Sequence, residues 1–422
     1  MIFSKIKGGA LQFTMFVVVV IALLLSAFIL LTHTYKTFKV QTDFTLETTQ
    51  NADTGIQYVL NNNILKNDSV FINLTDETYK TLQIHRNFWG VLEKVTSISK
   101  IKNKRFRKVA LVGGIQPEMN RTALYLEDNN RPLVLVGNTK IKGTAYLPKQ
   151  GVRTGNISGH SYYGNELIYG LTKESKTLPK PNKEFLERIN NIRNEVNTVN
   201  ETHFLDLERS RNHLNLFYNP LRIIYSTSSI NLSEVSLIGH ILVQSETKII
   251  VDESSHLKDV VLIAPKIEIK NHVKSTFQAI ATESISVGDY CKLDYPSTLV
   301  LKDSRQTLKL SNNRDDVVPF KIGKYSKIKG QIVYLGGSKN YNTQVFIDED
   351  ALIMGEVYCN KNLELLGSVH GSVYTSGFVA NQSGSAYQNH IYNGSIVVDN
   401  LPQEYVGLTF KGAKKGIVKW LY

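Results

Sequence analysis

Cysteine is almost absent from this chain of 422 residues, which contains only Cys291 and Cys359. Neither belongs to a Cys-x-x-Cys pair, so the sequence contains neither a cysteine zinc site nor a disulfide framework. We expect two unpaired thiols. The ten histidines are scattered and form no His-x-x-x-His or His-Glu-x-x-His motif. We therefore predict that the chain binds no metal and no cofactor.

Catalytic patterns are equally scarce. No glycine-rich segment follows a strand and opens a helix, which excludes a phosphate-binding loop. Two acidic clusters, Asp315-Asp316 and Asp348-Glu349-Asp350, are candidates for the paired carboxylates of a carbohydrate-active enzyme. Both have the composition of solvent-facing turns, and no column of Asp, His and Arg recurs along the chain. We therefore predict that the protein is not an enzyme, and a carbohydrate-active enzyme remains the alternative.

Charge is missing from residues 10–31, a run of 22 residues that is long enough to span a bilayer. The run is too long for the apolar core of a cleaved signal peptide, and no small-x-small cleavage site follows it. The sequence therefore predicts a transmembrane helix over 10–31 in contact with lipid. A cytoplasmic tail or leader over 1–9 precedes the helix, and a helical stalk over 32–66 follows it.

The orientation of this anchor is weakly marked, because Lys5 and Lys7 precede the span and Lys36 and Lys39 follow it. A short amino-terminal tail with the bulk of the chain translocated is the usual arrangement for a single anchor. We expect a single pass through a bacterial inner membrane, with the carboxy-terminal part outside the cytoplasm.

A period of 18 residues runs through residues 249–301. The apolar-x-apolar triplets recur as Ile249/Val251, Ile267/Ile269 and Ile285/Val287, and Ala264, Thr282 and Val300 fall in the same register. A short fixed period of this kind is typical of a β-solenoid, in which each coil buries its inner face only by stacking on its neighbours. Upstream, Ile230-Asn-Leu232 fits the same pattern with a slip of one residue.

The same pattern continues downstream across an insertion. Ile322, Gly330 and Ile332 recur 25 residues later as Ile347, Gly355 and Val357, and residues 336–343 supply a loop-like insertion. Val345 and Ile347 recur 18 residues later as Leu363 and Leu365, and Gly355 and Val357 recur after 16 as Gly371 and Val373.

The glycine-flanked segments 328–334 and 366–374 resemble the bactofilins, a polymer-forming cytoskeletal family. The resemblance covers about residues 228–398 of the sequence. It implies a three-sided β-helix, for which we expect a right-handed turn, that stacks end to end into filaments. No catalytic residues carry over, because bactofilins are not enzymes.

The start of the chain resembles a type IV prepilin. Lys7-Gly8-Gly9 precedes the apolar run, as the leader glycine of a prepilin does. Residues 51–60 resemble the segment that follows the anchor helix in PilX- and GspK-like minor pilins. The resemblance implies cleavage at Gly8, Gly9 or Ala10. Cleavage before Ala10 places Thr14 at mature position five, where most prepilins carry glutamate, so a plain signal anchor with a helical stalk is the alternative.

The remaining segments complete a mainly β fold class. We predict an antiparallel β-rich region over 67–136, the first β-helix coils over 137–170, a helical insertion over 171–224, the β-helix over 225–400 and a carboxy-terminal cap over 401–422. Within the insertion, Asn182 is a candidate N-cap, and Phe185, Ile189, Ile192, Val196 and Val199 form one apolar stripe. That helix is expected to pack on the flank of the β-helix or to cap its first coil.

Positive charge is in excess, with 49 Lys and Arg against 37 Asp and Glu. One basic run alternates with apolar residues, as in a hairpin with one basic face, and comprises Lys100, Lys102, Lys104, Arg105, Arg107 and Lys108. This face is either solvated or in contact with lipid headgroups or another anionic polymer. Aromatic residues are not interleaved as a base-stacking platform requires, so we predict no specific nucleic-acid recognition.

Together these features predict a membrane-anchored structural or scaffold protein. Its extracytoplasmic β-helix would mediate assembly or surface interactions through protein partners or self-association. A minor pilin-like subunit of a type IV pilus-like, secretion or DNA-uptake apparatus is the alternative function.

Overall fold

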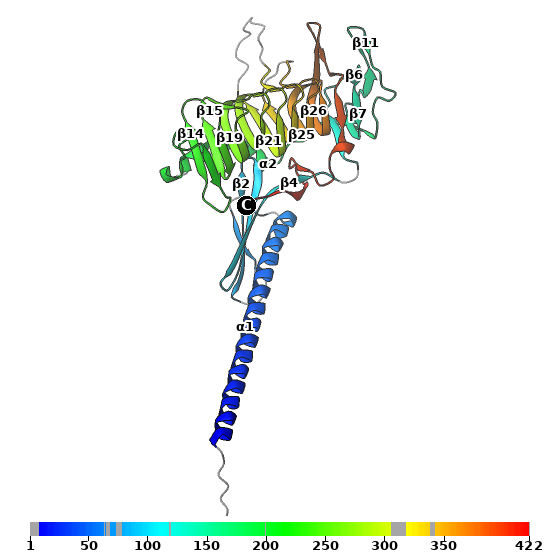
Figure 1. Ribbon diagram of the computed structural model, residues 1–422. Coiled ribbons are helices and arrows are strands. Elements are labelled where there is room, and N and C mark those ends of the chain that lie inside the picture. Colours follow the sequence, from blue (N-terminus) through cyan, green and yellow to red (C-terminus); the bar gives the residue numbers. More distant parts are fainter. Residues whose placement is uncertain are drawn as a thin grey trace, which may run out of the picture. The chain divides into compact units, whose positions relative to one another are not determined.

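The fold is mainly β and begins with one long apolar helix, as the sequence predicts (Figure 1). The structure is a computed structural model that describes residues 8–62, 64, 68–72, 78–117, 120–198, 200–304, 318–337 and 342–421. It divides into two compact units. Unit 1 comprises residues 1–58, 69–85 and 97–108, and unit 2 comprises residues 59–68, 86–96 and 109–422.

Helix α1 (Gly8–Asn61) is a single helix of 54 residues, so the predicted transmembrane segment and stalk are continuous (Figure 1). No proline interrupts it, and its only glycine beyond the first turn is Gly55. Residues 9–43 are exposed almost throughout. From Phe44 onward one face becomes buried, with its innermost residues three or four apart, as in a helix that packs on a sheet.

An antiparallel sheet follows in the order β1 (Ser69–Ile72), β2 (Lys80–Trp89), β3 (Leu92–Ile101) and β4 (Lys104–Ile115). The strands β30 (Val406–Gly407) and β31 (Lys414–Leu421) come from the other end of the chain, and both pair antiparallel with β4. The predicted cap over 401–422 is therefore replaced by strands of this sheet. The alternating side chains of 414–421 suit a sheet strand, whereas pairing with β4 depends on long-range contacts.

The other large β element is a set of parallel strands that closes on itself, called the parallel stack here. Its first strands are β13 (Asn212–Asn215), β14 (Arg222–Ser226), β15 (Ile230–Leu232), β16 (Ser236–Gly239), β17 (Ile241–Ser245) and β18 (Lys248–Val251). The longer strands that follow are β19 (His256–Ile269), β20 (Lys274–Val287), β21 (Lys292–Asp303), β23 (Lys327–Gly336), β25 (Leu352–Leu365) and β26 (Ser368–Gln382), with β22 (Phe320–Ile322) and β24 (Val345–Ile347) between them.

The register of the parallel stack confirms most of the predicted repeat. Ile249 pairs with Ile267, and Ile267 pairs with Ile285. Across the predicted insertion Gly330 pairs with Gly355, which pairs in turn with Gly371. One alignment is wrong, because Ala264 pairs with Ala281 rather than with Thr282. A register shift between Ala264 and Lys266 changes the local spacing.

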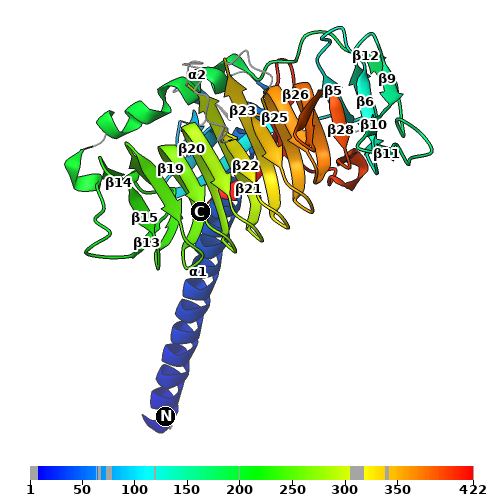
Figure 2. The same ribbon diagram turned by 90° about the horizontal axis from the view of Figure 1, so that it is seen from above.

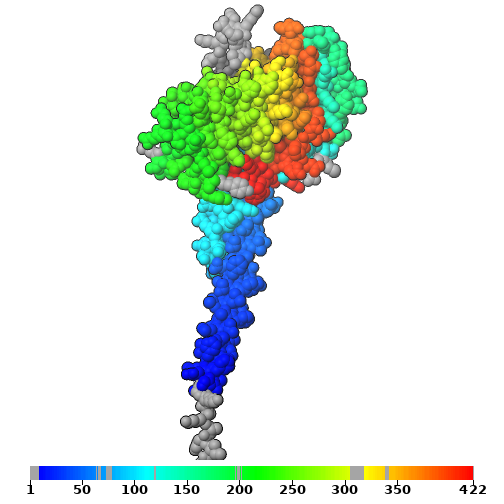
Figure 3. Space-filling view, viewed as in Figure 1, coloured from blue at the N-terminus to red at the C-terminus, as the bar shows by residue number. Residues whose placement is uncertain are grey.

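The inward side chains of the parallel stack form one continuous apolar core. It contains fully buried residues from every level, such as Ile249, Phe277, Leu299, Ile332 and Val369. Figure 3 shows the outer surface of the stack passing without a break from green residues of β14 to the orange residues of β26. Each level buries its inner face against the next, which is the arrangement that the repeat predicts.

The strands from residues 122–174 join the stack at its far end, next to β26 (Figure 2). Strand β5 (Thr122–Leu126) pairs in parallel with β26, β8 (Thr144–Leu147) pairs with β5, and β12 (Thr172–Glu174) pairs with β8. Strand β7 (Lys140–Lys142) pairs with β29 (Ser395–Val397), and β28 (His390–Tyr392), β6 (Leu133–Val136) and β9 (Val152–Thr154) form a small parallel sheet. Two hairpin pairings complete this end, β26 with β27 (Ser385–Gln388) and β10 (Asn156–Ile157) with β11 (His160–Ser161).

This arrangement corrects two predicted boundaries. The parallel strands begin at Thr122, inside the segment predicted as antiparallel, and they resume at Asn212, inside the predicted helical insertion. Residues 137–170 do form stacked levels, but they lie beyond β26 rather than before β13. Local sequence patterns identify a strand but not its partner, because pairing between strands some 250 residues apart is decided by tertiary contacts.

The predicted helix is shorter than its apolar stripe. Helix α2 (Lys183–Asn191) begins at Asn182, whose side chain accepts a hydrogen bond from the Glu184 backbone as predicted. A 3₁₀ helix, η1 (Ile192–Thr198), follows it, and two shorter ones are η2 (Glu201–His203) and η3 (Val398–Asn400). Figure 2 shows α2 beside the stack, where Asn190 contacts Lys302. It packs on the flank, the first of the two predicted positions.

Both ends of the stack core are covered by segments of the chain itself. At the β14 end, Phe204 bridges Ile223, and the neighbouring Leu205 and Leu207 pack against the core. At the far end, Tyr162, Leu167 and Ile168 pack against it. Such covers bury apolar surface and satisfy backbone groups that an open end would expose.

Candidate functional site

The first candidate is the anchor at the start of the chain. The predicted leader residues Gly8, Gly9 and Ala10 form the first turn of α1. The helix is long and apolar enough to cross a membrane, with a mean hydropathy of 3.0 in its most apolar window, and none of that window is buried. Its length and composition are those of a membrane anchor.

The carboxy-terminal part of α1 packs on the antiparallel sheet within unit 1. Thr48, Ala52 and Ile56 are almost completely buried on the helix, as are Leu82 and Ile84 on β2. Gly55 permits the closest approach, because a Cβ at this position would lie 2.2 Å from Ser97 Oγ on β3. The same helix is therefore exposed and apolar in its first half and part of a folded unit in its second.

The predicted basic hairpin is present, formed by β3 and β4 with a turn at Lys102 and Asn103. Several of its cations contact their own unit. Lys108 pairs with Asp53 of α1, and Lys102 Nζ lies 5.0 Å from the ring centroid of Phe44 and 5.1 Å from that of Tyr79. Lys100 and Arg105 are exposed, while Lys104 and Arg107 are half-buried. This cluster therefore divides between intramolecular contacts and solvent.

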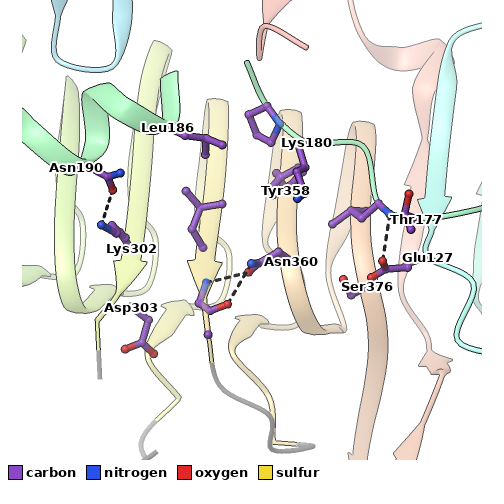
Figure 4. A pocket seen from close by; sticks show the side chains of 15 residues that line it. Glu127, Thr177, Lys180, Leu186, Asn190, Lys302, Asp303, Tyr358, Asn360 and Ser376 are labelled. Carbon is purple, nitrogen blue, oxygen red and sulfur yellow. Dashed lines mark hydrogen bonds between the residues drawn. The ribbon is translucent and has the colours of Figure 1, made fainter. Parts of the chain in front are cut away.

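A second candidate is a groove of about 680 Å³ on the outside of the parallel stack, drawn in Figure 4. Its floor comprises Asp303 and Gly336 at the ends of β21 and β23, and Asn360 and Ser376 within β25 and β26. Leu186 and Asn190 of helix α2 and the preceding extended segment 177–181 also line it. The groove crosses four successive levels, so it is long rather than deep.

The polar groups of this groove are largely engaged with one another. Lys302 donates to Asn190, and Asn360 exchanges hydrogen bonds with the backbone of Gly336 at 2.9 and 3.1 Å (Figure 4). Asp303 Oδ2 accepts from Tyr334 at 3.0 Å, and Glu127 accepts from the Leu178 backbone. Acid, base and nucleophile do not converge on one point among the groove residues described, which does not favour catalysis.

The acidic clusters considered for catalysis do not come together. Asp315 and Asp316 lie outside the described residues. The other cluster forms the turn between β24 and β25, where Asp348 accepts from the Glu349 backbone and Glu349 pairs with Lys324. Asp350 has a φ of 58°. These interactions assign the described cluster to turn geometry, as its composition predicts.

Sequence patterns miss a column of buried polar side chains on the outer face of the stack. Gln278, Thr298, Gln331, Glu356 and Ser372 pair in succession along the ladders, and all are buried. Gln278 accepts from the Val91 backbone and donates to the Trp89 carbonyl, both at 2.9 Å. Polar residues at outward strand positions normally indicate solvent, so nothing in the repeat signals that a second layer covers them.

Glu356 is the charged member of this column. It accepts hydrogen bonds from the Leu408 backbone and from Gln116 Nε2, the latter at 2.6 Å. Burial raises the pKa of Glu356 to about 7, although these hydrogen bonds lower it. Gln116 Oε1 and Gln331 Oε1 are buried acceptors with no hydrogen-bond donor among the described atoms. A protonated Glu356 therefore has acceptors nearby for its own proton.

A buried ionic cluster joins helix α2 to strand β31 within unit 2. Arg86 bonds to Glu93 at 2.9 Å and to Glu184, and Lys415 bonds to Glu93 at 2.9 Å. Burial lowers the pKa of Arg86, but the bonds to Glu184 and Glu93 outweigh it and raise that pKa. Burial likewise raises the pKa of Glu93, and the contacts with Arg86 and Lys415 outweigh it and lower that pKa. These contacts favour the charged forms of Arg86 and Glu93 and hold distant segments together.

The cysteines are free and buried, as expected, and burial raises the pKa of the Cys359 thiol to about 12. Such a thiol is unreactive at neutral pH. Among the described residues, no group of three His, Cys, Asp or Glu side chains is placed to hold a metal ion.

Comparison with known proteins does not assign this chain to a family. No protein-family model matches the chain, and no curated protein matches it in sequence. Among solved structures, the competence-associated pilin ComZ from Thermus thermophilus aligns over 90% of this chain and 97% of that chain, with 8% identity and a TM-score of 0.20. An alignment at that score supports no conclusion, so the candidate function depends on the geometry described above.

Proposed function

We propose that this protein is a membrane-anchored, minor pilin-like subunit of a type IV pilus-like, secretion or DNA-uptake apparatus. The observation that carries the proposal is the division of α1 into two parts. Its first half is exposed and apolar, and its second half is buried on an antiparallel sheet through Ala52, Gly55 and Ile56. A prepilin-type subunit needs one helix to serve both as membrane anchor and as part of its folded unit.

The leader sequence supports the same proposal. Lys7-Gly8-Gly9 lies immediately before the apolar run 10–31, where a prepilin peptidase would cut. Cleavage before Ala10 would leave α1 nearly complete, because the helix begins at Gly8. The anchor would lie in a bacterial inner membrane, with the remainder of the chain outside the cytoplasm.

The parallel stack is proposed to be a three-sided, bactofilin-like β-helix inserted into that subunit. The pairing of β19 supports three sides. Three different parts of this strand pair in parallel with β16, β17 and β18 of the preceding level, as expected if each level has three faces. The insertion lies between β4 and its partner β31, so the chain leaves the antiparallel sheet and returns to it. The residues that cover both ends favour a discrete domain over a filament formed by end-to-end stacking.

The decisive experiment is the identity of the mature amino terminus. The full chain would be extracted from membranes of cells that contain a prepilin peptidase, and its amino-terminal peptide identified by mass spectrometry. We expect a chain that begins at Gly9 or Ala10. A Gly8→Val/Gly9→Val double variant should remain unprocessed, while a Phe13→Leu control within the helix should be cut normally. An intact Met1 in the wild-type protein would exclude a processed pilin-like subunit and leave a signal anchor.

A second measurement addresses the discrete domain. Mass photometry or negative-stain imaging of the detergent-solubilised chain should give single particles as the concentration rises. Filaments that lengthen with concentration would instead favour the scaffold function that the bactofilin resemblance implies.

A further inference from the structure

One corner of the parallel stack repeats an aromatic-x-lysine pattern on three successive levels. The pairs are His272 with Lys274, Tyr290 with Lys292, and Tyr325 with Lys327. The rings form a continuous stack, with centroids 5.3 Å apart between His272 and Tyr290 and 5.0 Å apart between Tyr290 and Tyr325. This repetition was not singled out by the 18-residue period, because its residues point outward.

The three lysines are stacked directly on one another. Lys274 pairs in register with Lys292, and Lys292 pairs with Lys327. The preceding level carries Lys258, which pairs in register with Thr276 and therefore lies outside this row. The three stacked side chains are exposed, and none has an acidic partner among the residues that the structure describes. Lys274, Lys292 and Lys327 are called the lysine column.

Other lysines on the stack differ in this respect. Lys248 pairs with Glu268, Lys270 with Asp252, Lys324 with Glu349 and Lys329 with Asp294. Asp294 is the acid nearest to Lys292 in sequence, but it pairs with Lys329. Its charge therefore does not neutralise the lysine column. The three lysines that stack in register form no such pair among the described residues.

Such a column costs stability. Like charges directly opposite one another on adjacent strands repel, and adjacent strands are only about 4.8 Å apart. The aromatic residues beside them also occupy left-handed backbone positions, with φ of 63° at His272, 57° at Tyr290 and 59° at Tyr325. The rings stack on one another, whereas none of the three lysines forms a salt bridge among the described residues.

We propose that the lysine column binds the phosphate backbone of an extended single-stranded nucleic acid, without recognition of its bases. A straight row of cations on successive levels fits a linear polyanion. The ammonium group of lysine binds phosphate as a point charge, without the bidentate geometry that arginine brings to phosphate and carboxylate alike. The aromatic faces are occupied by one another, so base stacking, which requires free ring faces, is available only at the ends of the ring stack.

The test is binding of a fluorescent oligothymidylate to the full chain in detergent, followed by anisotropy as salt is varied. Three phosphate contacts predict a slope of log affinity against log salt of about −2, or roughly a 20-fold loss between about 50 and 200 mM salt. The variant K274Q/K292Q/K327Q should lose nearly all of that slope, and K274R/K292R/K327R should retain it. The matched control K149Q/K176Q/K411Q removes the same charge elsewhere and should bind like the wild type.

Three outcomes would overturn the proposal. If K274Q/K292Q/K327Q binds oligothymidylate as tightly as the wild type, the binding surface lies elsewhere. If the matched control loses the same affinity, the effect comes from the net charge of the protein and not from the lysine column. Polyglutamate that competes as well as unlabelled oligothymidylate would show an unselective anionic surface instead of a phosphate site. Circular dichroism of each variant establishes that the fold is intact. This result is independent of leader processing, so the two proposals can fail separately.

Discussion

Gly55 of helix α1 and Ser97 of strand β3 are in such close contact that a Cβ at position 55 would lie 2.2 Å from Ser97 Oγ. The contact joins the end of the anchor helix to the sheet within unit 1. Leu82 Cδ1 lies 3.2 Å from the same position, so a Cβ there requires these neighbours to move. Glycine at 55 is therefore a packing requirement, although alanine is the better helix former.

We predict that Gly55→Leu destabilises unit 1 by about 1–3 kcal/mol through overpacking. Hydrogen exchange should report it, with faster exchange in residues 80–85 and 97–108. The exposed Thr54→Ala substitution is the control and should leave exchange unchanged. The pair G55A/S97A should exchange more slowly than G55A alone, because it removes the Oγ contact; equal exchange in the two would refute the assigned contact.

Gly355 allows one level of the stack to lie on the next. Its φ is 150°, and a Cβ there would lie 1.9 Å from the Gly330 carbonyl oxygen. We predict that Gly355→Ala costs about 2–4 kcal/mol, because both the backbone angle and the contact are unfavourable. Gly337, which has nothing within 4 Å of a built Cβ, supplies the control Gly337→Ala. Denaturant unfolding followed by fluorescence of Trp89 and Trp420, both in unit 2, measures the difference.

Glu356 should make the stability of unit 2 depend on pH. Its folded-state pKa of about 7 lies above the ordinary value of 4.5, so the folded chain retains a proton that the unfolded chain has lost. The contribution of Glu356 to stability therefore falls as pH rises from about 4.5 through about 7, by about 3 kcal/mol in total. Burial lowers the pKa of His240 to about 3, so this histidine contributes in the opposite direction over part of the range. The test is therefore the difference in unfolding free energy between the wild type and Glu356→Gln, which remains neutral; a difference that does not fall across that range would contradict the assignment.

Arg86 should be far more important to stability than an exposed arginine. Removing one partner of a buried ion pair leaves an uncompensated charge, so Arg86→Ala should cost about 3–5 kcal/mol. Arg209 is exposed and lies 3.4 Å from Asp206, so Arg209→Ala should change stability by less than about 1 kcal/mol. Tryptophan fluorescence in denaturant compares the two variants directly, and similar costs would refute the buried network.

Much of the local structure was predictable because the relevant forces act over short stretches of chain. The run 10–31 has no charge, so its helix is dictated by composition alone. Ile267 and Ile285 revealed their pairing because each level must present apolar side chains to the same core. Asn182 marked the start of α2 through a bond to its own next turn.

The contacts and side-chain positions at the candidate surfaces could not be predicted from local sequence patterns. The basic hairpin at Lys102 and Lys108 was predicted as a structure, but its contacts with Phe44 and Asp53 were not. The lysine column was not predicted, because the register that stacks Lys274, Lys292 and Lys327 is set by strand pairing and not by the sequence around each lysine. The burial of Glu356 depended on a second layer that covers the outer face of the stack.

The sequence by itself determined the apolar helix, the repeat and the inward-facing residues, because periodicity and hydrophobicity specify which face of an element is buried. Only the tertiary structure decided that β31 returns to β4, that β5 stacks on β26, and that Arg86 meets Glu184. These pairings join residues that are distant in the chain. They are chosen by the free energy of burying whole surfaces together, which no local pattern encodes.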